Sequence, residues 1–436
     1  MTRWANVFVR WMPDAFSVAL ILTLIAGLSA VVVARFPLSS TVEAWGDGFW
    51  NLLTFTNQIT LTLLLGYALA ATTPVQSLLQ RAAARVRTPR AAYMTACALT
   101  GILALLSWGL SLVSAGIIAR AIGQKCRESG IRVHYPLLVA SAFSGFVIWH
   151  QGLTSSIGLS LATPGHFLEA QVGLISTDQT LFTAWNIGLA LFVLFLLPPL
   201  MAKLHPSDDH SLVEYTGPRE SGASAEPQQE STPAQWIDRS RWLILPLLAM
   251  SLGYVLVHFF QRGQGLELNV INFIFLFLGI GLAGSAGRYA QIIVEGGRVA
   301  APFLLQYPFY AGIAGIIATS GLASMIVDFF ASISTANTLP LFAFWSGGLL
   351  NIFIPSGGGQ WAVQGPLMMS AALEAGADLP RVAMAVALGD QWTNLIQPLT
   401  LIPVVTISGA ALRDVMPYTF VALLFTGATF SLALFL

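Results

Sequence analysis

The feature that most constrains this chain is a series of long apolar runs with almost no charge. A helix of about 20 apolar residues crosses the ~30 Å hydrocarbon core of a bilayer. Runs of this length occupy residues 16–36, 48–71, 181–201, 243–260, 270–286, 299–320 and 417–436. Charged residues make up only 9% of the chain, against roughly 25% in soluble domains, which is too few to cover a water-facing surface. The sequence therefore predicts an all-α polytopic membrane protein.

The start of the chain indicates how it is placed in the membrane. The first run follows Arg3 and Arg10 and is too long for the apolar part of a cleavable signal peptide. We expect a retained first span, a cytoplasmic N-terminus and a location in the bacterial cytoplasmic (inner) membrane. The formal net charge is zero, so the partners expected are the lipid bilayer and a small solute, and not nucleic acid.

Two further apolar regions are interrupted near their middle. Residues 91–119 contain SWGLS at 107–111, and residues 329–373 contain IPSGGGQW at 354–361. Three successive glycines after Pro-Ser do not continue a helix cheaply. We therefore predict two re-entrant hairpins that turn near the middle of the membrane.

The charges beside these regions suggest opposite orientations. The first region is flanked on both sides by basic residues: Arg81, Arg85, Arg87 and Arg90 before it, and Lys125, Arg127 and Arg132 after it. The second is flanked by Asp328, Glu374 and Asp378. Because basic flanks stay in the cytoplasm, the first hairpin is expected to open inward and the second outward.

Each predicted hairpin is followed by an apolar run with polar residues at its centre. Residues 136–163 are interrupted by WHQGLTSS at 149–156, and residues 382–411 by GDQWTN at 389–394 and Gln397-Pro398. We predict two helices broken at membrane depth, which are tolerated only where they line a cavity or face protein.

The order of these elements is the same in both halves of the chain. We predict a first membrane repeat at 1–204, a polar cytoplasmic linker at 205–240, and an extra span with a second, inverted repeat at 241–436, with about nine full spans. Interrupted segments at matching positions of two repeats point to a transporter's binding site.

The predicted site lies where the two hairpins and two broken helices meet. Exposed backbone N–H groups, half-helix N-termini and hydroxyl groups there could hold a small carboxylate. The substrate-binding candidates are Trp108, Gly109, Ser111, Thr154, Ser155, Ser356, Gly357, Gly358, Gly359, Gln360, Trp361, Trp392, Asn394 and Gln397. The candidates for coupling a cation are Asp390, His150 and Thr393. We expect no cofactor beyond a coupling ion, Na⁺ or H⁺.

Structural roles are open alternatives for several of these residues. The glycines could serve close helix packing, and the tryptophans could be core or interface residues. Asp390 could cap a half-helix, and His150 could be a buried neutral histidine bonded to the backbone.

At these residues the sequence resembles the bacterial short-chain fatty acid transporters. The matching stretches are 45–53 (WGDGFWNLL), 135–138 (YPLL), 306–313 (QYPFYAGI), 355–361 (PSGGGQW) with 364–366, and 389–394 (GDQWTN) with 397–398. The similarity runs from the first span to the last and omits only the linker. Two positions depart from the family pattern: His150-Gln151 stands in place of a glycine-rich stretch, and Asp390 in place of a glutamate.

The resemblance implies uptake of short-chain carboxylates such as acetoacetate or butyrate. It also implies kinship with the ion transporter superfamily, whose members often work by an elevator motion within a homodimer. A channel or exchanger for another organic anion or a cation is an alternative. An intramembrane enzyme is another, although the sequence contains no His/Glu metal motif.

Overall fold

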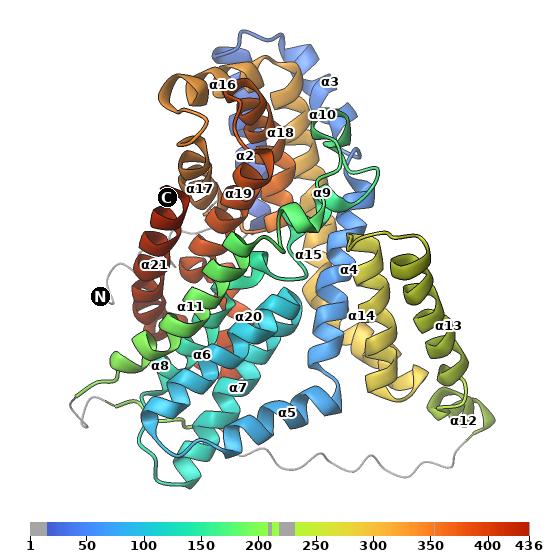
Figure 1. Ribbon diagram of the computed structural model, residues 1–436, viewed down its shortest axis with the longest axis vertical. Helices are drawn as coiled ribbons and strands as arrows, with labels where there is room; N and C mark the ends of the chain where they lie inside the picture. The colour runs from blue at the N-terminus through green and yellow to red at the C-terminus, as the bar shows by residue number, and fades with distance from the viewer. Residues whose placement is uncertain (1–14, 208–211, 218–231, 353, 436) are drawn as a thin grey trace.

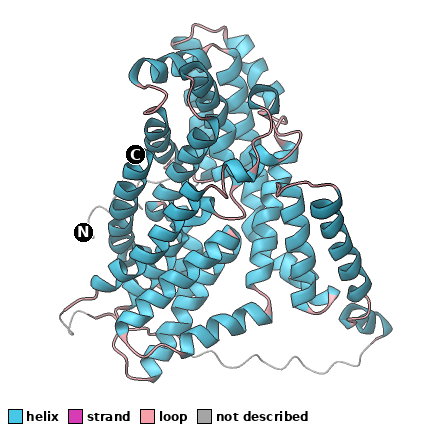
Figure 2. Cartoon of the chain, viewed as in Figure 1, coloured by secondary structure: helices cyan, strands magenta, loops and turns pink. Residues whose placement is uncertain are grey.

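The computed structural model describes residues 15–207, 212–217, 232–352 and 354–435, and within these ranges every regular element is a helix (Figures 1 and 2). This confirms the predicted all-helical class. In the first half the elements are α2 (Ala15–Val32), α3 (Leu38–Gly48), α4 (Leu53–Ala70), α5 (Thr73–Ala84), α6 (Pro89–Leu106), α7 (Trp108–Glu128), α8 (Tyr135–Ser144), the 3₁₀ helix η1 (Gly145–Gln151), α9 (Ser156–Ala162), α10 (Glu169–Val172), η2 (Thr177–Gln179) and α11 (Ala184–Lys203).

The second half follows a short helix, α12 (Pro233–Arg239), which lies at the end of the predicted linker. Its elements are α13 (Ile244–Leu256) with the π-helical turn η4 (Val257–Gln261), α14 (Leu268–Ala283), α15 (Ala286–Thr319), α16 (Leu322–Ile333), α17 (Leu339–Asn351), α18 (Gly357–Ala375), α19 (Leu379–Thr393), η5 (Asn394–Ile396), α20 (Pro398–Ser408) and α21 (Leu412–Phe435).

The two halves present the same succession of elements from opposite ends of the molecule. The series α4, α5, α6–α7, α8–η1–α9, α11 in the first half matches α15, α16, α17–α18, α19–η5–α20, α21 in the second. In Figure 1, α5 lies at the bottom and α16 at the top, and the α6–α7 and α17–α18 hairpins lie in the lower and upper halves. Such an arrangement is that of an inverted repeat.

Both hairpins turn on a serine that begins the returning helix. Ser107 has an extended backbone and its Oγ accepts from the amide of Leu110 at 3.3 Å. Ser356 is also extended and its Oγ accepts from the amide of Gly359 at 3.4 Å. A serine in this position satisfies one of the amides that the first helical turn leaves free, so the chain reverses without stranding that group in the membrane interior.

The hairpin tips differ from the sequence prediction in one respect. Gly357–Gly359 were expected to form the irregular turn, yet they are the first three residues of α18. Their helical conformation follows from the Ser356 cap, and their lack of a Cβ serves close packing: a Cβ on Gly358 would lie 2.5 Å from the Tyr307 hydroxyl. The turn itself therefore lies just before Ser356.

The membrane spans also have different bounds from those expected. The run at 299–320 is the second part of α15, a single helix of 34 residues that begins at Ala286. Among the described residues, seven helices are long and apolar enough to cross a membrane, and α14 and residues Phe16–Val32 of α2 form shorter apolar helices. The count of nine full spans stays a prediction, as do the limits of the two repeats.

The linker contains a segment that is not simply solvated. The backbone of Val213 donates to His134 Nδ1 at 3.2 Å, and its carbonyl accepts from the amide of Tyr135 at 2.7 Å. Tyr215 is 4% exposed and its ring lies 5.0 Å from that of Tyr135. Residues 212–217 of the predicted polar linker therefore dock on the start of α8 through Tyr215 and the Val213 backbone, while the side chains of Val213, Glu214 and Thr216 stay exposed. Most of its acidic residues, among them Asp208, Asp209, Glu220, Glu226 and Glu230, lie outside the described residues.

We predict that Tyr215→Ala releases this docked segment. Truncating a buried aromatic ring costs about 3 kcal/mol, which converts to roughly a hundredfold rise in local opening. Hydrogen exchange should show faster exchange at the amides of Val213 and Tyr135. Val213→Ala is the matched control because the Val213 side chain is 53% exposed and its backbone bonds stay in place. Unchanged protection in Tyr215→Ala would contradict the docking role.

Candidate functional site

A buried histidine and aspartate join the two broken helices at the centre of the molecule. His150 Nε2 lies 3.1 Å from Asp390 Oδ2, and both side chains are 0% exposed. His150 comes from η1 in the first half and Asp390 from α19 in the second. Neither half therefore holds this pair without the other.

Side-chain amides extend this link between the halves. Gln391 accepts from the backbone N–H of His150 at 2.8 Å and donates to Gln151 Oε1 at 3.3 Å. Gln151 in turn donates to the carbonyl of Asn186 on α11 at 3.1 Å. The backbone N–H of η1 that the 3₁₀ turn frees thus finds its partner on the opposite repeat.

A second amide cluster fastens the α17–α18 hairpin to the second broken helix. Asn351 donates to the carbonyl of Asp390 and to Thr393 Oγ1, each at 2.9 Å. Gln397 donates to the carbonyl of Ile352 at 2.8 Å. The accepting carbonyls are those of Ile352, at the C-terminal end of α17, and of Asp390, in the last turn of α19 before the break. Such carbonyls need partners because lipid offers none.

Each hairpin tip also contacts the first broken helix. The amide of Trp108 donates to Thr154 Oγ1 at 3.0 Å, and Leu153 donates its amide to the carbonyl of Leu105 at 2.7 Å. From the other side, a Cβ placed on Gly357 would lie 2.5 Å from His150 Nε2. Only glycine lets the α18 tip approach the imidazole this closely.

A cavity of about 230 Å³ lies where these elements converge. This is below the ~300–1,000 Å³ of sites for drug-sized ligands, and so suits a small solute. The cavity is lined by Ile59, Leu63, Trp108, Leu112, Phe146, Trp149, Ser156, Pro302, Phe303, Gln306, Pro355, Ser356, Gly357, Gly358, Asn394, Thr400 and Pro403. Both hairpin tips and both broken helices contribute to this wall, with α4 and α15 closing the remaining side.

The wall is mostly apolar, and the described residues that line it include no ionisable side chain. Its polar groups are hydroxyls, amides and two indoles. The indole nitrogens of Trp108 and Trp149 have no hydrogen-bond partner in the described part of the chain. The N-termini of α7 and α18 also reach the cavity, at Trp108 and Gly357. These donors favour an anion without supplying a full positive charge.

Some of the predicted residues line the cavity, and others form hydrogen bonds that connect neighbouring segments. Trp108, Ser356, Gly357, Gly358 and Asn394 line it. The remaining candidates that hold hydrogen bonds between neighbouring segments are Ser111, Thr154, Ser155, Gln360, Thr393 and Gln397. Gly109 and Gly359 pack against Leu63 on α4 and Tyr310 on α15.

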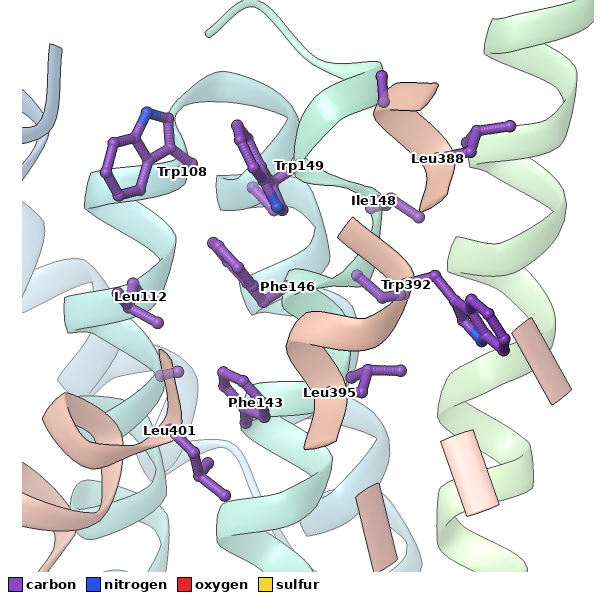
Figure 3. Packing of buried hydrophobic residues seen from close by; sticks show 14 of the residues in the cluster. Trp108, Leu112, Phe143, Phe146, Ile148, Trp149, Leu388, Trp392, Leu395 and Leu401 are labelled. Atoms are coloured by element: carbon purple, nitrogen blue, oxygen red, sulfur yellow. The ribbon is translucent and has the colours of Figure 1, made fainter. Parts of the chain in front are cut away.

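Two of the predicted tryptophans lie away from the cavity. Figure 3 shows Trp108, Phe146 and Trp149 on one side of the α19 segment and Trp392 on the other. Trp392 donates to the carbonyl of Leu423 at 2.7 Å. Trp361 is 0% exposed and its ring packs on Gly365. Both are positioned as packing residues, which was the alternative left open for them.

Several lining residues were missed from the sequence. Ser156 is the last residue of the 149–156 stretch, Thr400 lies two residues beyond Pro398, and Phe303 and Gln306 come from α15. Gln306 belongs to the QYPFYAGI stretch, which is part of the family resemblance noted from the sequence. That stretch alone does not show which face of a long helix meets a cavity.

We predict that Gly357→Ala strains the contact between the α18 tip and His150. The added methyl group meets the imidazole, and overpacking of this kind costs about 1–3 kcal/mol, so the melting temperature of the purified protein should fall. Gly297→Ala on α15 is the matched control, since a Cβ there has nothing within 4 Å, and it should be neutral or slightly stabilising. Equal melting temperatures for the two variants would contradict the close contact.

The whole chain matches a known family. The family model described as "Short chain fatty acid transporter" covers residues 1–436. A protein of Escherichia coli (strain K12), provisionally named a short-chain fatty acid transporter, is 36% identical over 100% of this chain and 98% of its own length. A protein of Haemophilus influenzae (strain ATCC 51907 / DSM 11121 / KW20 / Rd) with the same provisional name is 32% identical over 100% of this chain and 99% of its own.

Solved structures share the fold at much lower identity. The YdaH transporter of Alcanivorax borkumensis, whose topology is described as unusual, superposes with a TM-score of 0.62 at 14% identity, covering 97% of this chain and 98% of that one. MtrF of Neisseria gonorrhoeae superposes with a TM-score of 0.59 at 15% identity, covering 99% and 97%. The full-length match to the family model and to both relatives leaves one conclusion: this chain is a member of the short-chain fatty acid transporter family, a family of transporters and not of enzymes.

Proposed function

We propose that this protein is a secondary active transporter that takes up short-chain monocarboxylates, such as acetoacetate or butyrate, across the bacterial cytoplasmic membrane. Uptake is coupled to a cation, Na⁺ or H⁺. The observation that carries the proposal is the small cavity at the meeting point of both hairpin tips and both broken helices. This is the position at which inverted-repeat transporters bind their substrates.

The chemistry of the wall fits a short fatty acid. The apolar side chains Ile59, Leu63 and Leu112 suit a hydrocarbon tail of a few carbons. The indole N–H groups of Trp108 and Trp149, which have no partner among the described residues, and the N-terminus of α18 suit a carboxylate head group. A longer or bulkier acid would exceed the volume.

The missing positive charge is the reason for a coupling cation. An isolated carboxylate is very costly to hold in a low-dielectric interior, and the lining residues include no lysine, arginine or histidine. A cation that travels with the anion removes this cost. Asp390, His150 and Thr393 are the coupling candidates.

The orientation follows from the charges at the two ends. The basic residues that flank the first hairpin support a cytoplasmic position for α5 and the base of that hairpin, together with the N-terminus and the 205–240 linker. The family resemblance further suggests a homodimer in which the hairpins and broken helices move as an elevator.

The alternatives are a channel or an exchanger for another organic anion or a cation, and transport outward. MtrF is described as representing a class of antimetabolite efflux pumps. The direction of transport by this protein therefore has to be measured. Single-channel currents in a planar bilayer would favour a channel, because a carrier that alternates around a closed cavity gives none.

The decisive test is uptake of radiolabelled butyrate into sealed proteoliposomes, with Na⁺ and pH gradients imposed separately and in both directions. Protein-dependent accumulation driven by one inward gradient is expected. No protein-dependent flux under any gradient would overturn the proposed function.

We predict that Ser356→Ala and Asn394→Ala each reduce butyrate uptake at least severalfold without loss of folded protein. Ser356 caps the helix that reaches the cavity, and Asn394 faces the cavity from the second broken helix. Ser332→Ala and Asn337→Ala, which remove the same groups at exposed positions near α16, are the matched controls. Normal uptake by both site variants would sink the assignment of these residues.

We also predict that Trp108→Phe raises the KM for butyrate about tenfold while keeping the aromatic wall. The change removes one N–H donor, and a hydrogen bond to a charged group contributes about 1.5–3 kcal/mol. Trp345→Phe is the control because its ring is 49% exposed and lies outside the cavity. An unchanged KM in Trp108→Phe would show that this indole does not bind the carboxylate.

A further inference from the structure

We infer that the coupling ion is a proton and that the His150–Asp390 pair carries it. This inference rests on the proposed function and deepens it, because it names the ion and the two atoms, His150 Nε2 and Asp390 Oδ2, between which the proton is held.

The first step is the charge of the pair. With a neutral imidazole and an ionised carboxylate, the pair bears one negative charge at 0% exposure. One added proton makes it neutral overall, either as imidazolium with carboxylate or as imidazole with carboxylic acid. Since burial of an uncompensated charge is strongly unfavourable, the pair gains a proton most readily when a second negative charge arrives nearby.

The second step is the lack of any other group to compensate that charge. The segments packed around the pair, residues 53–70, 91–119, 135–163, 184–202, 299–327, 339–351, 357–373 and 415–435, contain no lysine, arginine, aspartate or glutamate, and residues 382–408 contain only Asp390 itself. Titratable neighbours on the packed elements are Tyr307 on α15, near Asp390, and Tyr310 beside it. Both are phenols, and the hydroxyl of Tyr307 is engaged with Ser356 Oγ at 2.9 Å. The proton therefore belongs to the His–Asp pair.

The third step is the ligand set, which suits a proton better than a metal cation. Hard cations are held by several oxygen ligands at once, whereas the contact of Asp390 Oδ2 at 3.1 Å is a nitrogen. The Asn394 side chain approaches the carboxylate, yet in the described chain neither Asp390 oxygen makes a hydrogen bond, so the 3.1 Å approach of His150 Nε2 to Oδ2 is an ion-pair contact.

The fourth step is the connection between the pair and the cavity. The imidazole stacks on the Trp149 ring with centroids 3.6 Å apart, and Gly357 abuts Nε2. Trp149 and Gly357 both line the cavity, so the pair lies directly behind its wall. His150 Nδ1 is held by Ser155 Oγ at 3.0 Å, which directs the other nitrogen, Nε2, at Asp390. A carboxylate in the cavity and the proton on the pair are therefore close enough to stabilise one another.

Proton uptake on binding is the direct test. Butyrate is added to wild-type protein in weakly buffered detergent solution near pH 7, and the proton change is read with a pH-indicator dye. We expect close to one proton taken up per butyrate bound. The Kd for butyrate should then increase as the pH is raised, with a limiting slope of about tenfold per pH unit. Binding with no proton uptake overturns the inference and leaves the proposed function standing.

Variants test which group holds the proton. In proteoliposomes, Asp390→Asn and His150→Gln should lose accumulation driven by a pH gradient, and any butyrate exchange that they retain should be independent of pH. Asp390→Glu, which keeps a carboxyl group, should retain part of the pH response. Asp378→Asn, an exposed helix cap on the same α19, and His166→Gln, in a loop, are the controls and should behave as wild type.

The outcomes separate the two levels of the proposal. Butyrate counterflow by wild-type protein without any ion gradient tests transport alone, and its absence overturns the proposed function together with this inference. Counterflow that is present, with accumulation that follows Na⁺ and not pH, overturns the proton assignment alone. The same holds if Asp390→Asn accumulates butyrate under a pH gradient as well as wild type does.

Discussion

The rest of the structure depends on one constraint, the need to satisfy backbone groups where helices break inside the membrane. A helix that stops at membrane depth leaves amides and carbonyls that water cannot reach. Here asparagine, glutamine, serine and threonine side chains form hydrogen bonds with these backbone groups, and many of the bonds connect different segments. Gln391 accepts the amide of His150 across the repeats, and Asn351 donates to the carbonyl of Asp390. Each break is therefore stable only in the presence of its neighbours, which concentrates the broken elements in one place.

The same constraint explains the character of the proposed binding site. Helices that begin at the centre of the membrane bring their N-termini there, and these carry a partial positive charge. Trp108 and Gly357 begin two such helices and lie on the cavity wall. The site thus favours anions through backbone and indole N–H groups, and it avoids the cost of burying an arginine or lysine with no anion bound. The wall can remain mostly apolar, as a short hydrocarbon tail requires.

Much of the fold could be predicted from the sequence because breaks and apolar runs are local features. Both hairpins and both broken helices occur where glycine, proline and polar residues interrupt uncharged stretches. The site was predicted less well. Trp392 and Trp149 sit beside equivalent polar breaks, yet only Trp149 faces the cavity. Which way a side chain points depends on helix rotation, and in a helix buried on all sides no amphipathic pattern records it. The docked segment at 212–217 escaped notice for a related reason, because its contacts are mainly backbone bonds.

The placement of the charges completes the physical picture. Asp390 and His150 are both 0% exposed, and they come from different repeats and meet behind the cavity wall. If the two groups served only to fasten the repeats, an amide pair would do so without an ionisable carboxylate, as Gln391 and Gln151 do nearby. Retaining an ionised carboxylate at 0% exposure costs stability. Such a cost is expected where a change in the charge of the group serves the function. A pair that is charged in one state and neutral in another, placed beside a proposed anion site, would explain why a buried carboxylate is kept here despite that cost. The anion and the proton can then enter the low-dielectric interior only as a neutral set.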